Sequence, residues 1–218
     1  HLLSRRQRQM CIRDSLKIGV SSTLCKYLLL PYLKEFIRQN PHISISISCQ
    51  STNDTLKLLE DNKIDIGLIG KPENLKNIHF DFLEEIEDIF VAAKDYLRNL
   101  KARGIQKDHI LQSSTLMLLD KNNMTRQYID DYLQENQIII KDSIDISDMD
   151  LLIDFARIGV GVACVIKNFV REDLENGTLV EIPLGFPIHK REVGFAYKTT
   201  TKPSKSLAEF IHFYKTYR

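Results

Sequence analysis

Small polar side chains stand where two predicted strands end and two predicted helices begin. Ser21-Ser22-Thr23 follows an apolar strand at 16–20, and Asn123-Met124-Thr125 follows another at 115–119. Free backbone N–H groups at a helix N-terminus, together with the positive end of the helix dipole, favour an anion such as a carboxylate or sulfate. The same residue types also cap helices without binding a ligand, so the residues alone leave both interpretations open.

Two more polar segments follow strands in the first half of the chain. Gln50-Ser51-Thr52 comes after a predicted strand at 43–49, and Gly70-Lys71 comes after one at 64–69. Lys71 is the nearby cation, although a lysine beside a proline is more often ordinary surface. The candidate binding residues are therefore Ser21, Ser22, Thr23, Gln50, Thr52, Gly70, Lys71, Asn123, Met124 and Thr125.

Residues for catalysis or metal binding form no recognisable pattern. The chain has no Gly-rich phosphate loop, no GxSxG and no HExxH, and its histidines are scattered. Cys25, Cys49 and Cys164 lie far apart without a CxxC or a paired histidine, whereas a zinc site needs closer spacing. We expect no catalytic residue, no metal site and no cofactor, although a nucleophile can pair with a distant base in space.

The segment 16–69 predicts the scaffold that positions the polar groups. Its strands and its helices alternate as β-α-β-α-β with short connections, which requires parallel strands joined by right-handed crossovers. In such a sheet, ligands bind outside the carboxyl ends of the strands. The strand at 43–49 alternates Ile with Ser and is expected at a sheet edge.

The rest of the chain repeats the α/β pattern. Two strands, at 78–86 and 88–93, are followed by a polar stretch at 95–112 where we expect a crossing into a second subdomain. Further strands are predicted at 115–119, 142–146, 161–165, 178–182 and 192–199, and helices at 125–136, 148–158, 168–175 and 204–217. The acidic run from Glu84 to Asp88 is expected to be a solvated turn.

The first fifteen residues do not fit this pattern. Arg5 to Ser15 looks like the translation of a sequencing-library adapter, so residues 1–15 are expected to be non-native and the true N-terminus to be missing. The alternative is a basic arm that binds DNA. These residues hold four Arg and one Asp of the chain's 30 basic and 29 acidic residues. The remainder therefore has 26 basic and 28 acidic residues, a net charge of about −2, which does not favour a phosphate backbone.

Length and composition narrow the class further. The chain has 218 residues, 43% hydrophobic and 27% charged, which is ordinary for a globular protein with one large or two small cores. Its longest apolar runs have the length of strands, so no membrane-embedded segment is expected.

Several short motifs in the right order carry a family resemblance. The first half contains Ser21-Ser22-Thr23, Leu29-Leu30-Pro31, Asn40-Pro41 and a strand at 63–68, and the second half contains segments 147–149, 156–163 and 176–180. Together they resemble the effector-binding domain of LysR-type transcriptional regulators, nearly from Leu16 to the end. The chain departs from this family's pattern at Ile166, where proline is frequent, and at Arg157, where a small residue is frequent. Arg157 would alter the wall of the ligand-binding cleft that the resemblance implies.

The resemblance implies a fold, a ligand and an oligomeric state. The fold is α/β, with two Rossmann-like subdomains and a double crossover, of the periplasmic-binding-protein type 2 class. Subdomain I would cover about 16–94 and 190–218, and subdomain II about 95–189. The ten candidate residues would hold a small organic or inorganic anion in a cleft between them. The chain would form a homodimer or tetramer, pairing head to tail.

The resemblance also implies where the whole protein acts. DNA would be bound only through an N-terminal winged helix-turn-helix missing here, in a bacterial cytoplasmic protein with no membrane contact. The alternative of a different class is an extracytoplasmic solute-binding protein of a transporter, which shares the fold. A third interpretation is an enzyme on the same scaffold, such as a dehydratase.

Overall fold

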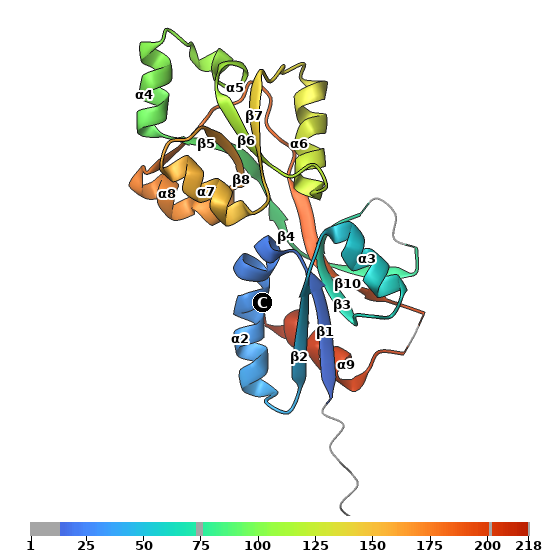
Figure 1. Ribbon diagram of the computed structural model, residues 1–218. Helices are drawn as coiled ribbons and strands as arrows, with labels where there is room; N and C mark the ends of the chain where they lie inside the picture. The colour runs from blue at the N-terminus through green and yellow to red at the C-terminus, as the bar shows by residue number, and fades with distance from the viewer. Residues whose placement is uncertain (1–13, 73–75, 201, 218) are drawn as a thin grey trace, which may run out of the picture. The chain divides into compact units, whose positions relative to one another are not determined.

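The computed structural model describes residues 14–72, 76–200 and 202–217. The chain folds into two compact α/β units, one formed by residues up to Asp81 and from Phe195 on, the other by Phe82–Gly194 (Figure 1). Both divisions fall inside long strands, so the chain passes between the units twice. The expected double crossover is therefore confirmed.

The first unit is built on a five-stranded sheet with the order β2-β1-β3-β10-β4. Strand β1 pairs in parallel with both β2 and β3, and β2 lies at the expected edge. The bounds are β1 Ser15–Val20, β2 Ser44–Cys49, β3 Ile66–Gly70, β4 Ile78–Ile86 and β10 Arg191–Lys198.

The helices of the first unit include one irregular segment, a π-helix. They are α1 Ser22–Leu24, the π-helix η1 Cys25–Leu29, α2 Leu30–Gln39, α3 Thr52–Glu60 and α9 Lys205–Thr216. In the π-helix, the Leu30 N–H donates to the Cys25 carbonyl, five residues back. The wider turn falls just before Pro31, whose missing N–H would interrupt a regular helix.

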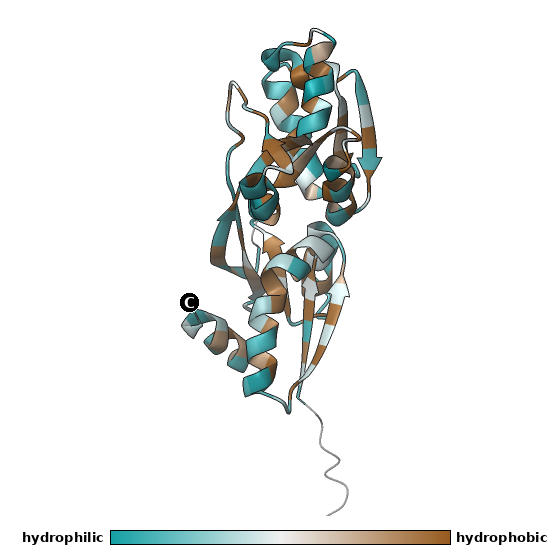
Figure 2. Cartoon of the chain, turned by 90° about the vertical axis from the view of Figure 1, so that its left-hand side faces the viewer, coloured by the Kyte–Doolittle hydropathy of each residue, from teal (hydrophilic) through white to brown (hydrophobic). Residues whose placement is uncertain are grey.

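Aromatic side chains form much of the core of this unit. Phe36 from α2, Phe195 from β10 and Phe210 from α9 are fully buried, with the Phe36 and Phe210 ring centroids 5.0 Å apart. Figure 2 shows apolar residues concentrated on the strands, while the helices alternate apolar and polar faces. The closing helix therefore packs on the sheet through aromatic edge contacts as well as apolar area.

The second unit has a sheet with the order β7-β6-β8-β5-β9. Strand β6 is parallel to β7 and β8, while β5 is antiparallel to β8 and β9. The strands are β5 Asp88–Ala93, β6 Thr115–Leu119, β7 Asp142–Ile146, β8 Val162–Ile166 and β9 Leu179–Glu181. The helices are α4 Lys94–Ala102, η2 Lys107–His109, α5 Ile110–Ser113, α6 Met124–Glu135, α7 Met149–Arg157, η3 Lys167–Val170 and α8 Arg171–Asn176.

The subdomain boundaries differ from those expected. The prediction placed 88–94 in the first subdomain, but β5 lies inside the second sheet, and the divisions fall at Asp81 and Gly194. Apolar continuity marks β5 as a central strand but does not tell which sheet it joins. The polar stretch at 95–112 forms α4, η2 and α5 within the second unit.

Most of the segment taken as non-native, residues 1–13, lies outside the described residues. Its last two members join the first unit through their backbone. The Asp14 carbonyl accepts from Ser44 N at 2.8 Å, and the Ser15 carbonyl accepts from Ser206 Oγ at 2.7 Å. These two residues, which the sequence pattern left out of the first strand, therefore join the first unit by backbone pairing, which does not depend on side-chain identity.

No helix within residues 14–72, 76–200 and 202–217 combines the length and the apolar character that a membrane crossing requires.

Candidate functional site

The turn after β1 contains a residue that caps the helix and a residue whose hydroxyl is free in the part of the chain that the structure describes. Ser21 has an extended backbone, and its Oγ accepts a hydrogen bond from Leu24 N at 3.2 Å, so Ser21 is the N-cap. Ser22 and Thr23 are the first two residues inside the helix. Within the described residues the half-buried Thr23 hydroxyl has no hydrogen-bond partner, so it remains available to a ligand.

Gln50 lies over the end of β1. Its Nε2 donates to Thr55 Oγ1 at 3.1 Å, and a Cβ at position 19 would stand only 2.8 Å from that nitrogen. Gly19 is therefore needed so that the amide can lie against the strand. Ser51 caps α3 by accepting from Asp54 N at 3.1 Å, which leaves Thr52 as the first helical residue.

The strand register brings the polar segments of this unit to one sheet edge. Val20, the last residue of β1, is paired with Cys49 on one side and Leu68 on the other. The Ser21 turn, Gln50 and the Gly70-Lys71 segment consequently follow neighbouring carboxyl ends. The arrangement offers hydroxyl, amide and backbone N–H donors together, the chemistry that an anion or a hydroxylated small molecule requires.

The second unit has a comparable turn after β6. Asn123 is the N-cap of α6, with its Oδ1 accepting from Thr125 N at 2.8 Å. Asn123, Met124 and Thr125 are half-buried. Unlike Thr23, Thr125 is already engaged, since its Oγ1 accepts from Arg191 at 3.3 Å.

Arg191 is the polar residue that the sequence did not identify. Its Nε and one terminal nitrogen bind the Asp88 carboxylate at 2.7 and 2.9 Å, and its guanidinium lies 5.3 Å from the Tyr128 ring centroid. Burial raises the pKa of Asp88 above its usual range, and the two Arg191 bonds oppose that rise. Asp88 is 2% exposed, so the expected solvated turn is wrong at this residue.

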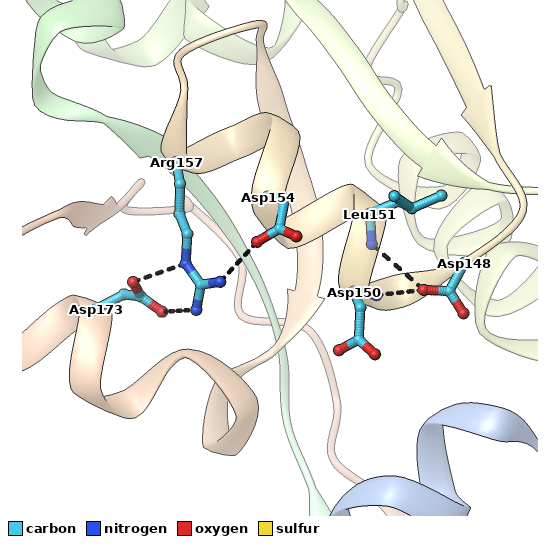
Figure 3. A network of polar contacts seen from close by, with 6 residues as sticks. All are labelled: Asp148, Asp150, Leu151, Asp154, Arg157 and Asp173. Atoms are coloured by element: carbon cyan, nitrogen blue, oxygen red, sulfur yellow. Dashed lines mark hydrogen bonds and ion pairs between the residues drawn. The ribbon is translucent and has the colours of Figure 1, made fainter.

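Arg157 is an ion-paired residue at the end of α7 (Figure 3). Its guanidinium binds Asp173 through two nitrogens, at 2.9 and 2.7 Å, and Asp154 at 2.7 Å. The bonds to Asp173 are the main cause that raises the pKa of Arg157. The same helix begins at Asp148, whose carboxylate accepts from two backbone N–H groups. Arg157 thus joins α7 to α8 rather than offering a free cation.

Residues suited to a metal do not gather in the described part of the chain, where no cluster of three or more His, Cys, Asp or Glu side chains occurs. The polar groups that do gather at the strand ends are hydrogen-bond donors. Two α/β units of this kind define a class of protein, the small-molecule-binding domains of the periplasmic-binding-protein type 2 fold.

The family follows from direct comparison. The family described as the LysR substrate binding domain matches residues 12–218, and the chain belongs to this family. It is a domain of transcriptional regulators, so the resemblance seen in the sequence is confirmed. Neither the enzyme interpretation nor the transporter alternative is favoured by this membership.

Two relatives of this chain are transcriptional regulators. The chain is 22% identical over 200 residues to the HTH-type transcriptional regulator YeiE of Escherichia coli K12, covering 91% of this chain and 67% of that protein. It is 22% identical over 206 residues to the HTH-type regulator CysL of Bacillus subtilis, covering 94% and 68%. The chain therefore spans about two thirds of the length of these relatives.

Solved structures share the fold. The regulatory domain of HypT from Salmonella typhimurium superposes with a TM-score of 0.76 at 18% identity, covering 91% of this chain and 92% of that one. The effector-binding domain of QuiR in complex with shikimate gives 0.74 at 17%, covering 94% and 97%. The Synechocystis CcmR regulatory domain in complex with 2-PG gives 0.78 at 15%, covering 92% and 95%. The predicted fold class is confirmed.

Proposed function

We propose that this chain senses a small anionic effector on behalf of a LysR-type transcriptional regulator. The observation that carries the proposal is the set of donors after β1 and β2, where the Thr23 hydroxyl and the Gln50 amide stand beside the start of a helix. The binding residues are those named from the sequence: Ser21, Ser22, Thr23, Gln50, Thr52, Gly70, Lys71, Asn123, Met124 and Thr125.

The ligands of structural neighbours support an anion. QuiR is described in complex with shikimate, and an OxyR2 variant of Vibrio vulnificus is described as sulfate-bound. HypT is described as bromide-bound. Shikimate and sulfate carry oxygens that accept hydrogen bonds from hydroxyl, amide and backbone donors, which are the groups gathered at the sheet edge of the first unit.

The proposed regulator binds DNA through a segment other than this one. The relatives are named HTH-type regulators, and residues 16–218 have a net charge of about −2 that does not attract a phosphate backbone. In this proposal the effector favours one conformation of the domain, and that preference changes how winged helix-turn-helix modules are presented to DNA. The proposed compartment is the bacterial cytoplasm.

A ligand screen tests the proposal directly. Small carboxylates, shikimate, phosphate esters and sulfate are added to the chain, and each anion is paired with its neutral amide or alcohol analogue. We expect at least one anion to raise the melting temperature in a saturable manner while its neutral analogue does not. The proposal is contradicted if neutral compounds stabilise the chain as well as their anions do, or if none of the anions binds.

A further inference from the structure

A large pocket of the second unit lies away from the proposed effector residues. It has a volume of about 890 Å³ and lies beside α4, the turn at 104–107 and the edge strand β9. Its apolar wall is aliphatic and includes Leu97, Leu100, Ile105, Ile110, Val180 and Ile182. A pocket of this size falls in the range that holds small organic ligands.

The β6–α6 turn lies at one end of the strands of this sheet, and the strand register places the pocket at the other end. Asp88 at the start of β5 pairs with Ile166 at the carboxyl end of β8, whereas Ala93 at the end of β5 pairs with Leu179. The pocket wall continues from that second end, since α4 begins at Lys94 and α5 leads into the amino end of β6. A five-residue strand such as β6 separates its two ends by about 15 Å. The pocket is therefore distinct from the Asn123-Met124-Thr125 turn.

The rim of the pocket is positively charged. Lys94, Arg98 and Lys101 follow the i, i+4, i+7 spacing of one face of α4, and Lys107 adds a fourth cation. The lining also contains two carboxylates, but Asp95 binds Arg98 and Glu181 binds Lys167 at 3.0 Å. Among the described residues, Lys101 and Lys107 make no ion pair, so two exposed cations face solvent beside an aliphatic wall.

We propose that this pocket binds an amphiphilic organic anion, a carboxylate with an aliphatic body, at a second ligand site. The aliphatic wall would bury the hydrocarbon part, and Lys101 and Lys107 would meet the carboxylate at the rim. The described lining residues include no aromatic ring, which favours a saturated chain over a flat aromatic ligand. The charge excess at the rim selects an anion over a neutral alcohol of the same length.

Octanoate is the probe, measured by isothermal titration calorimetry on the whole chain. We expect one saturable site for which octanoate binds at least about tenfold more tightly than acetate, because acetate lacks the chain that the wall buries. Octanol should bind about three- to tenfold more weakly than octanoate, because exposed ion pairs contribute modestly. Equal binding of octanoate and acetate, or no saturable octanoate site, overturns the proposal.

Variants locate the site. Ile105→Trp fills the pocket from its half-buried wall and should abolish octanoate binding, with circular dichroism and melting showing a folded chain. Should that variant fail to fold, the exposed pair Lys101→Glu and Lys107→Glu should still weaken octanoate about three- to tenfold and leave octanol unchanged. The matched control, Lys141→Glu with Lys202→Glu, changes the same charge elsewhere and should bind octanoate normally.

The test of the second site can fail or succeed independently of the proposed effector site. Thr23 lies in the first unit, whereas the pocket lies in the second. Thr23→Val should therefore leave octanoate binding unchanged. Loss of octanoate binding in Thr23→Val, with Lys101→Glu and Lys107→Glu behaving like wild type, would place the probe at the effector site and overturn the second-site proposal.

Discussion

Two hydroxyls in the first turn differ in hydrogen bonding, since one has a partner in the described part of the chain and the other has none there. Ser21 Oγ satisfies the Leu24 N–H, while Thr23 Oγ1 has no partner among the described residues. Thr23→Val should therefore reduce affinity for an anion found in the screen by about ten- to a hundredfold, since a charge-assisted hydrogen bond is lost. The melting temperature should hardly change. Calorimetric titration and thermal melting on the same variant measure both quantities.

Ser21→Ala is the matching cap variant, expected to cost about 1 kcal/mol of stability. Thr200→Val, in an exposed position of the same unit, controls for the hydroxyl-to-methyl change itself. The assignment of Thr23 to the ligand fails if Thr23→Val binds the anion like wild type and melts at a lower temperature.

A second prediction at this scale concerns the buried pair of Arg191 and Asp88. Arg191→Met keeps a long side chain but leaves the fully buried Asp88 carboxyl without its partner, at a cost of about 3–5 kcal/mol in unfolding free energy. Adding Asp88→Asn to Arg191→Met removes the stranded charge and should recover part of that loss. Urea denaturation of both variants measures it, and equal stability of single and double variants would show that the charge is not what matters.

The sequence predicted the polar residues at helix starts, but it did not predict contacts between residues far apart in the chain. The hydroxyl and amide residues at strand ends are visible because local spacing puts them at helix starts, and Ser21, Ser51 and Asn123 are indeed N-caps. Arg191 was missed because its partner lies 103 residues away in the chain. No local period marks such a pair, and a charged residue in an acidic neighbourhood is ordinarily solvated.

At the scale of elements, one carboxylate joins strand β4 to helix α9 in the first unit. Asp81 on β4 accepts from Tyr214 of α9 at 2.6 Å and lies 3.0 Å from Lys215 and 2.9 Å from His79. Burial acts to raise the pKa of Asp81, but hydrogen bonds from Tyr214, Lys215 and His79 outweigh it, so the pKa is lowered. A lowered pKa means that the folded state prefers the carboxylate.

Asp81→Asn should therefore destabilise the chain by about 1.5–3 kcal/mol at pH 7, the range for hydrogen bonds to a charged group. The wild-type advantage is fully present above the ordinary Asp pKa of 3.8 and is lost as pH falls through the lowered folded value. Melting from pH 7 to pH 3 measures the difference, with the exposed Asp131→Asn as control. A gap between Asp81→Asn and wild type that stays constant with pH would contradict the ionic role.

Element types were predictable where periodicity is strong, and sheet membership was not. The apolar run of β5 and the alternation of β4 both predicted strands, and both exist. Which sheet each strand joins depends on β8, β9 and β10, which come more than 70 residues later in the chain. A strand pattern has no information on such distant partners, and the expected boundary therefore fell one strand too late.

At the scale of the whole molecule, exposed apolar residues occur on both units. On the first unit they are Leu30 and Ile37 of α2 and Ile47 of the edge strand β2, and Ile37 is 48% exposed. On the second, Leu151, Phe155 and Ile158 follow i, i+4, i+7 spacing at α7, and Ile158 is 73% exposed. Apolar stripes of this kind mark surfaces for association, and both units have one.

The last prediction is that these two surfaces meet in a second copy of the chain, paired head to tail. Light scattering at tens of micromolar should give the mass of a dimer or tetramer. Ile37→Asp with Ile158→Asp should give a monomer, since charges would be buried without partners. Ile139→Asp changes a residue that is 75% exposed outside both surfaces and should leave the mass unchanged. A wild-type chain that is monomeric at this concentration would mean that the stripes are simply solvent-facing, and that any pairing of the whole regulator depends on other segments.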